Sequence, residues 1–321
     1  MILCQKPSDY LLVYMKYRIR DFHFDEDFNQ AREFLGEVFR LTGKHYTWVP
    51  SSLENEKRGQ CGTGYTPNDD EWIKIWELVN GNASTIVALT ILKSYGWFWI
   101  NIHPDHGNLI REIIPAIESQ AREMLEKKED TLKIGIPVPV SFESRSQYLK
   151  EFGYKDRGIR EHNRVRQHNV PPPDFQPPEG YITRNVKLPD DFEEYRAVLS
   201  SVFPHCSNMT KELAQIYSEA EFYNDELDLV VETPDMRFAA FVTVRIDPVT
   251  KMAELEPVGT HPHYRGLGLG KAVCAEGIRR VQKYNPSCIV ILGAASTESA
   301  TKLYDSLGFS KEDVHFWEKV I

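Results

Sequence analysis

The sequence predicts a mixed α/β fold in which two halves repeat one order of strands and helices. Three observations lead to this interpretation. A proline-rich segment, VPPPDFQPPEG (170–180), interrupts the chain near its middle and can sustain neither a helix nor a central strand. On both sides of it, apolar segments typical of strands alternate with segments of helical periodicity. Each half also carries a short helix stopped by a glycine, at Gly153 and at Gly308.

The second half gives the clearer pattern. Its hairpin turns at Pro234-Asp235, and the continuously apolar CIVILGA (288–294) is typical of a strand buried inside a sheet. The expected elements are a strand at 181–186, a helix at 190–203, a hairpin at 227–247, a strand at 252–262, a helix at 266–284, a strand at 288–294, a helix at 297–307 and a strand at 315–321.

The first half repeats this order more loosely. Its expected elements are a strand at 17–22, a helix at 29–41, strands at 84–92 and 96–104, a helix at 109–127, a strand at 132–140 and a helix at 144–152. We therefore expect a first domain at 1–169, a stiff linker at 170–180 and a second domain at 181–321. Residues 1–14, before Met15, are expected to be a short extension.

Composition narrows the class of protein. The chain has 321 residues, of which 41% are hydrophobic and 26% charged, as in ordinary soluble proteins. Its formal net charge of −9 argues against a nucleic-acid-binding protein. No apolar run is long enough for a signal peptide or a membrane span, so we expect a cytoplasmic protein without a membrane partner. The five cysteines lack CxxC spacing, which favours reduced thiols and argues against a metal site.

The most informative motif is GTHPHYRGLGLGKAV (259–273). A strand enters a loop with glycines at alternate positions, and the loop enters a helix directly. Glycines let a ligand approach the backbone, and the unpaired N–H groups and dipole of a helix N-terminus attract anions. Arg265 and Lys271 add positive charge, so the loop suits a pyrophosphate. It does not fit a Rossmann fingerprint, which requires GxGxxG near the start of a βαβ unit.

This loop resembles the acyl-CoA pyrophosphate loop of the GNAT (Gcn5-related N-acetyltransferase) superfamily, whose pattern is Q/R-x-x-G-x-G/A. Further along, ATKLYDSLGF (300–309) is similar to the second GNAT signature, and Thr297 stands where that signature often has asparagine. The resemblance covers about 140 residues, and it is strongest for two-domain, mycothiol-synthase-like members. It implies two tandem GNAT-like domains and acetyl-CoA as cosubstrate without a metal. The residues expected to bind acetyl-CoA are Val258, Gly259, Thr260, Arg265, Gly266, Leu267, Gly268, Leu269, Gly270, Lys271, Thr297 and Ala300.

The strand before the loop holds two candidate bases. Glu254 and Glu256 are two residues apart and so share one face of the strand. The resemblance implies that Glu254 acts as base through water, so Glu254 is the first choice and Glu256 the second. The alternative is that the two glutamates simply alternate on a half-solvated strand. Pro257 has no N–H to donate and is expected to mark a bulge or splay in the sheet.

Tyr304 is the candidate acid, since the resemblance places it where many GNAT enzymes protonate the departing CoA sulfur. Its alternative role is core packing, because Ala300, Leu303, Tyr304 and Leu307 form a helical stripe. His261, next to the loop, is expected to be structural. Most tryptophans of the first half are expected in the core: Trp48, Trp72, Trp76, Trp97 and Trp99. Tyr217, Phe222 and Tyr223 lie in a segment that often borders the acceptor site in the family, and the alternative is that they pack on a helix face.

The first half lacks both signatures. When His103-Pro104 is aligned with His261-Pro262, Ile110 occupies the position of Gly268 and Glu112 that of Gly270. The branched side chain would block the phosphates, and the carboxylate would repel them. Leu149 stands in place of Tyr304. We therefore expect a degenerate first domain that covers the second domain's sheet and walls its acceptor cleft.

Together these features predict an N-acetyltransferase that transfers acetyl from acetyl-CoA to a primary amine of a small molecule, by direct attack in a ternary complex, as a monomer or homodimer. Two alternatives remain open. One is acetylation of a protein lysine or N-terminus. The other is a non-catalytic acyl-CoA-binding module that regulates a partner.

Overall fold

The structure is a computed structural model that describes residues 16–43, 48–58, 72–125 and 132–321. The proposed extension at 1–14 and two of the cysteines, Cys4 and Cys61, lie outside these ranges. In the described parts of the chain, the strands form two sheets, which we call the first and the second sheet. No helix in those ranges has both the length and the apolar character needed to cross a membrane.

The first sheet is antiparallel and has the strand order β1-β2-β3-β4. Its strands are β1 (Lys16–Asp21), β2 (Ile73–Asn80), β3 (Ala83–Leu92) and β4 (Phe98–Ile102). The helices of this half are α1 (Phe24–Thr42), α2 (Pro50–Arg58), α3 (Ile110–Leu125) and α4 (Glu143–Glu151). Ile113, Ile114 and Ile117 on one side of α3 are buried against the sheet, as an amphipathic helix requires.

The second sheet has the order β5-β12-β6-β11-β10-β9-β8-β7 and takes strands from both halves of the chain. Its strands are β5 (Lys133–Pro139), β6 (Lys155–Gln167), β7 (Ile182–Asn185), β8 (Asp228–Glu232), β9 (Phe238–Ile246), β10 (Met252–Thr260), β11 (Cys288–Ala295) and β12 (Ser310–Val320). The helices of the second half are α5 (Phe192–Val202), α6 (Lys211–Ser218), α7 (Leu269–Val281) and α8 (Glu298–Ser306).

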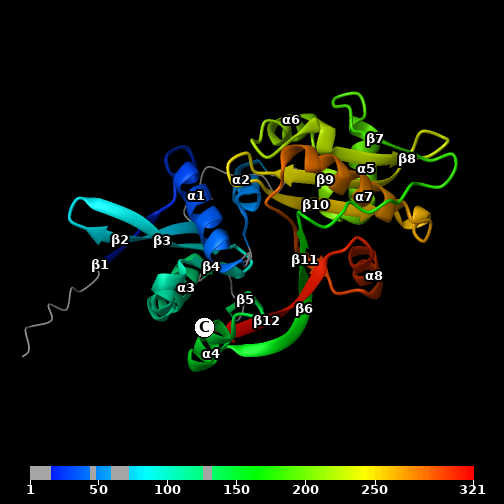
Figure 1. Ribbon diagram of the computed structural model, residues 1–321. Coiled ribbons are helices and arrows are strands. Elements are labelled where there is room, and N and C mark those ends of the chain that lie inside the picture. The colour runs from blue at the N-terminus through cyan, green and yellow to red at the C-terminus, as the bar shows by residue number, and fades with distance from the viewer. Residues whose placement is uncertain (1–15, 44–47, 59–71, 126–131) are drawn as a thin grey trace, which may run out of the picture.

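The two halves exchange their last strands. β6 of the first half lies between β11 and β12 of the second half, and β12 in turn lies between β5 and β6 of the first half. Figure 1 shows β6 in green running alongside the red β12, with β11 beyond it. The two α/β repeats expected from the sequence are confirmed, and the second sheet is shared between the halves, because β5 and β6 of the first half lie in it beside the strands of the second half.

Four elements of the structure were not expected from the sequence: β2, β6, α2 and α6. The sequence of β6, KDRGIREHNRVRQ, is too charged to suggest a central strand. Arg164 and Arg166 are nevertheless fully buried, because Arg164 forms an ion pair with Asp305 and Arg166 donates to the carbonyl oxygen of Leu307. The Arg164 charge is paired with a distant carboxylate, and Arg166 donates to backbone carbonyl oxygens, including that of the distant Leu307. Local patterning does not show these distant contacts and so cannot reveal the strand.

One expectation about the cysteines is wrong. Cys206 is disulfide-bonded, whereas the sequence suggested reduced thiols throughout. Cys274 and Cys288 are free and buried, as expected for thiols that fill the core. Folding brings together cysteines that are distant in the sequence, and spacing alone does not reveal such a pair.

Candidate active site

The site begins where β10 and β11 separate. The two strands pair in parallel only from Met252 to Glu254, opposite Cys288 to Val290. The pairing of β10 with β9 shifts register between Leu255 and Val258. The bulge expected at Pro257 is therefore present. Beyond it, the edge of β10 that faces β11 is open, which leaves backbone groups available to an extended ligand arm.

The glycine loop forms an anion cradle at the open end of β10. Gly266 and Gly268 have φ of +83° and +78°, conformations that L-residues with side chains avoid, and a Cβ at either position would meet open space. Gly268 is the N-cap of α7, so the first N–H groups of this helix point into the loop without intrahelical partners. Gly270 serves packing instead, because a Cβ there would lie 2.6 Å from the Thr260 hydroxyl oxygen.

The charged and apolar residues of the loop that were expected to bind acetyl-CoA make different contacts in the structure. Arg265 is exposed, and its Nε donates to the carbonyl oxygen of Thr260 at 3.2 Å. Lys271 points elsewhere, since its ammonium lies 3.4 Å from the ring centroid of Phe175 in the proline-rich segment. Leu267 is exposed on the loop, whereas Leu269 is buried beneath it.

The neighbouring strand and helix hold the other expected contacts. Val258 is half-buried beside the opening, and Gly259 lies close to the Phe241 ring, where a Cβ would clash. The Thr297 hydroxyl accepts from the Ala300 N–H at 3.3 Å and so caps the N-terminus of α8. The threonine that replaces the family's asparagine thus stabilises a helix end in this structure.

A cavity of about 300 Å³ opens beside the separated strands, between the two halves of the chain. Its lining combines aromatic, acidic and amide side chains. The residues are Trp48, Ser52, Asn55, Glu56, Lys93, Tyr95, Trp97, Trp99, Glu161, Asn163, Arg245, Glu254, Glu256, Leu292 and Gly293. Both candidate bases therefore face one cavity, to which both halves contribute.

Glu254 is held tightly in this cavity. Only 3% of it is exposed. Its carboxylate accepts from the Ser51 hydroxyl at 3.0 Å and the Ser52 hydroxyl at 3.2 Å, both at the start of α2, and lies 3.6 Å from Arg245 Nη1. These contacts connect Glu254 on β10 to α2 of the first half and to Arg245 on β9.

Glu256 has a different environment on the same strand. It keeps part of its surface open to the cavity. Burial raises the pKa of Glu256 to about 7; Arg245 opposes this rise, and Glu254 adds to it. The pKa of Arg245 is also shifted. Burial lowers it, but the nearby Tyr217, Glu254 and Glu256 raise it by more, so the pKa lies above its usual value. A carboxylate with a pKa near neutrality is suited to general base catalysis.

Tyr304 lies on α8, across the opening from β10. It is 7% exposed and packs edge-on against Phe309 within the core, so its ring does fill the helical stripe. Burial raises the pKa of Tyr304 well above its usual value, with Cys274 and Glu256 adding to the rise and Arg164 opposing it. The hydroxyl therefore stays protonated at neutral pH and can donate.

Several residues of this cavity were missed by the sequence analysis. Most of the first-half tryptophans were expected in the core. Trp76 lies there, Trp48 belongs to the core and also lines the cavity, and Trp97 and Trp99 line the cavity. Glu161 and Asn163 come from β6, and no local signal marks them, because the strand exchange alone brings them to the site.

Other aromatic and histidine candidates are structural. Tyr217 and Phe222 are buried in a small cluster against which Tyr223 packs, outside the cavity lining. The ring of His261 accepts from the backbone N–H of His263 at 3.2 Å, which orders the strand end as expected. His103 in the first half makes the same contact to Asp105.

Among the described residues of the first half, no equivalent cradle is present before α3. The 3₁₀ turn there (Pro104–Leu109) continues directly into α3, and Ile110 has right-handed helical φ and ψ. The reason differs from the one expected from sequence. Ile110 is 2% exposed and packs into the first-half core, so its side chain does not obstruct a loop. What is missing is the left-handed glycine turn that exposes the N–H groups.

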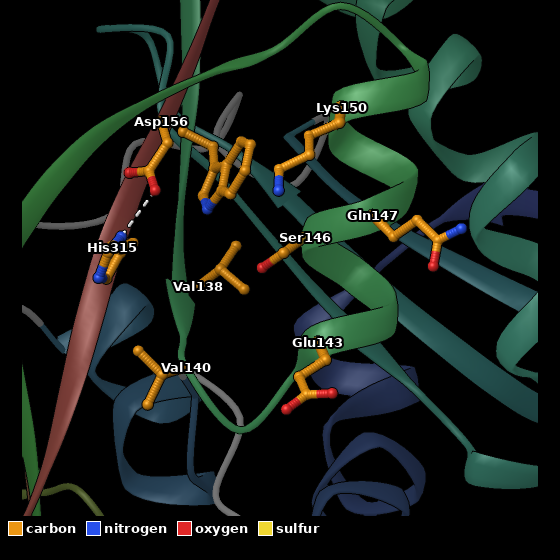
Figure 2. A pocket seen from close by; sticks show the side chains of 9 residues that line it. Val138, Val140, Glu143, Ser146, Gln147, Lys150, Asp156 and His315 are labelled. Atoms are coloured by element: carbon orange, nitrogen blue, oxygen red, sulfur yellow. Dashed lines mark hydrogen bonds and ion pairs between the residues drawn. The ribbon is translucent and has the colours of Figure 1, made fainter.

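A second hollow of about 510 Å³ lies between α4, β5 and β12 (Figure 2). In it, His315 Nδ1 and Asp156 Oδ2 are 2.8 Å apart, and Ser146 and Lys150 on α4 face the same space. This hollow contains none of the candidate residues from the two signatures. We therefore assign the candidate active site to the cavity at Glu256.

Comparisons with known proteins agree with this geometry. Residues 192–309 match the acetyltransferase (GNAT) family. Mycothiol acetyltransferase of Paenarthrobacter aurescens (strain TC1) is 27% identical over 148 residues, 44% of this chain and 46% of that protein. Mycothiol acetyltransferase of Arthrobacter sp. (strain FB24) is 26% identical over 183 residues, 53% of this chain and 55% of that protein. The matched segments thus span about half the length of these curated relatives.

Solved structures extend the similarity to both halves. A GCN5-related N-acetyltransferase from Sphaerobacter thermophilus superposes with a TM-score of 0.65 at 15% identity, covering 94% of this chain and 95% of that one. A tandem GNAT protein from the clavulanic acid biosynthesis pathway gives a TM-score of 0.62 at 15% identity, covering 95% and 98%. Residues 192–309, which contain the signature loop, are thus similar to the GNAT acetyltransferase family, and the fold of the whole chain is shared with a tandem GNAT protein.

Proposed function

We propose that this protein is an N-acetyltransferase that moves the acetyl group of acetyl-CoA to a primary amine of a small molecule, by direct attack in a ternary complex. The observation that carries the proposal is the position of Glu256. A carboxylate with a pKa of about 7 faces a cavity at the point where β10 and β11 separate. The curated relatives support the class of reaction, since they are named mycothiol acetyltransferases.

In this proposal the pyrophosphate binds at Gly266–Gly268 and the N-terminus of α7, and the pantetheine arm runs along the open edge of β10. The acceptor enters the cavity as an ammonium ion, attracted by carboxylates, and Glu256 removes its proton. The neutral nitrogen forms a bond to the thioester carbon, and the carbon–sulfur bond breaks as the intermediate collapses. The Tyr304 hydroxyl donates a proton to the departing sulfur.

The geometry reverses the sequence-based order of the two bases. We propose Glu256 as the base, because the carboxylate of Glu254 already accepts from two serine hydroxyls and pairs with Arg245. Glu254 then acts as a positioning residue that fixes Arg245 and joins α2 to β10.

Cavity size favours a small acceptor. A volume of about 300 Å³ holds a compact molecule, and first-half residues such as Trp48 and Trp97 form one wall. A protein lysine or N-terminus would need an open groove for the flanking peptide.

The direct test is release of CoA from acetyl-CoA in the presence of a panel of small primary amines, compared with a panel of lysine peptides. We expect turnover with at least one small amine and none with the peptides. Acetyl-CoA binding without turnover of any acceptor would favour the non-catalytic module, and faster reaction of the peptides would favour protein acetylation.

A further inference from the structure

The exchanged strand β6 places an unused hydrogen-bond donor in the acceptor cavity. Asn163 is 1% exposed and lines the cavity opposite a register shift in β11 between Ile291 and Ala294. Its Oδ1 accepts from the backbone N–H of Gly293 at 3.3 Å. That bond fixes the orientation of the amide, because only the oxygen can accept. The Nδ2 group is buried and has no hydrogen-bond partner among the described residues.

A matching acceptor lies on another element of the first half. Asn55 on α2 also lines the cavity, and its buried Oδ1 has no partner among the residues that the structure describes. Buried polar atoms without partners are costly and rare in native proteins. One free donor and one free acceptor in a single cavity indicate a ligand that both accepts and donates, as a hydroxyl group does.

The aromatic wall argues against a second cation on the acceptor. The Lys93 ammonium already lies 5.7 Å from the Trp48 ring centroid, and the Arg160 guanidinium lies 4.2 Å from that of Trp97. These faces are thus occupied by positive charge from the protein itself. A neutral carbon skeleton packs against the remaining aromatic surface at no electrostatic cost.

The carboxylates argue against an anionic acceptor. Glu56, Glu161, Glu254 and Glu256 all line the cavity, against the two cations Lys93 and Arg245. Burial raises the pKa of Glu161, and its carboxylate lies against Gly293 on the far side of the opening from Glu256. The reacting ammonium is therefore the one cationic group that this cavity favours.

We propose that the acceptor is a hydroxylated primary amine of the amino alcohol class, and that Asn163 of the exchanged strand recognises its hydroxyl. Asn163 Nδ2 donates to the hydroxyl oxygen, and Asn55 Oδ1 accepts from that hydroxyl or a neighbouring one. The inference rests on the proposed acetyltransferase function. It gives the degenerate first half a direct part in acceptor selection, through a strand inserted into the second half's sheet.

The test compares two amines that differ by one hydroxyl, trans-2-aminocyclohexanol and cyclohexylamine, with 1,4-diaminobutane as a dication. For the wild-type protein we expect kcat/KM for the amino alcohol to exceed that for cyclohexylamine by about 10- to 100-fold, because the unhydroxylated amine leaves the amides unpaired. In Asn163→Ala and Asn163→Asp, this ratio should fall toward one. The aspartate keeps an oxygen for the Gly293 N–H and replaces the Nδ2 donor with a charged carboxylate oxygen that cannot donate, while the alanine removes the donor without adding charge.

The ratio of the two amines is measured within each variant, so partial unfolding cancels and a merely structural role of Asn163 leaves it unchanged. A wild-type ratio near one, a ratio that survives both substitutions, or a preference for 1,4-diaminobutane would overturn the inference while leaving acetyl transfer intact. Failure of the wild-type protein to acetylate any of the three amines, together with other small amines, would overturn the proposed function and this inference with it.

Discussion

At the scale of single residues, the two glutamates of β10 show how environment separates equivalent side chains. Glu254 and Glu256 lie two residues apart on one strand and line one cavity. The carboxylate of Glu254 is held by Ser51, Ser52 and Arg245, whereas burial and the neighbouring Glu254 raise the pKa of Glu256 to about 7. The two side chains therefore differ through their partners from α2 and β9, and this difference is the basis for proposing Glu256 as the base.

The first prediction follows from the pKa of Glu256. A base must be deprotonated to act, so kcat/KM should fall as the pH drops below about 7 and level off above it. Glu256→Gln should lower kcat at pH 7 by roughly 10²- to 10⁴-fold and remove this acid limb. Steady-state kinetics between pH 5.5 and 9 measure both effects. An unchanged pH profile in Glu256→Gln would assign the base elsewhere.

Glu254→Gln is the matched control and has a different expected result. Its amide can replace only part of the contacts to the serines and Arg245, so the melting temperature should fall, consistent with a loss of about 3 kcal/mol for a broken buried pair. The acid limb near pH 7 should persist. If Glu254→Gln abolishes that limb and Glu256→Gln keeps it, the order expected from sequence is the correct one.

Tyr304 gives a second prediction at this scale. Removing its hydroxyl leaves the ring in place against Phe309. Tyr304→Phe should therefore lower kcat while the KM for acetyl-CoA stays nearly unchanged, the mark of an interaction made mainly in the transition state. An unchanged kcat with a shifted melting temperature would return Tyr304 to a packing role.

At the scale of elements, the glycine loop before α7 depends on backbone conformation. Gly268 has φ of +78° with open space where a Cβ would be. Gly268→Ala should weaken acetyl-CoA binding by about tenfold or more, because the loop relaxes and the N–H groups turn away. Gly81, in the turn between β2 and β3, is a matched control with φ of +63° and equally open space. Gly81→Ala should cost a similar ~1 kcal/mol of stability without changing the dissociation constant by calorimetry.

The exchange of β6 and β12 makes a prediction about the separate halves. A fragment of residues 181–321 lacks the strand that lies between β11 and β12. We expect this fragment alone to show no cooperative unfolding and no acetyl-CoA binding, and to recover both when produced together with residues 1–169. Circular dichroism and co-purification measure the two outcomes. A folded, binding-competent fragment would mean that β6 is dispensable to the second half.

At the scale of the whole molecule, the two repeats are similar in fold and unequal in binding. The left-handed glycine turn is present before α7, while the turn before α3 continues straight into its helix. Calorimetry should therefore find one acetyl-CoA site per chain, and Gly268→Ala should weaken that one site. A stoichiometry of two would show that the first half retains a cradle of another kind.

The sequence by itself determined the repeated α/β order, the anion-binding loop and the candidates Glu254, Glu256 and Tyr304, because periodicity, glycine spacing and the two signatures are local patterns. Only the tertiary structure showed that the pKa of Glu256 is about 7. It also showed that side chains distant in the sequence line one cavity, among them Trp48, Trp97, Glu161 and Asn163. The physical reason lies in β6, whose charged sequence resembles a surface segment until Asp305 and the backbone of the other half compensate its buried arginines. Compensation between residues more than a hundred positions apart leaves no trace in local patterning, and it allows β6 to bring first-half side chains to the proposed active site.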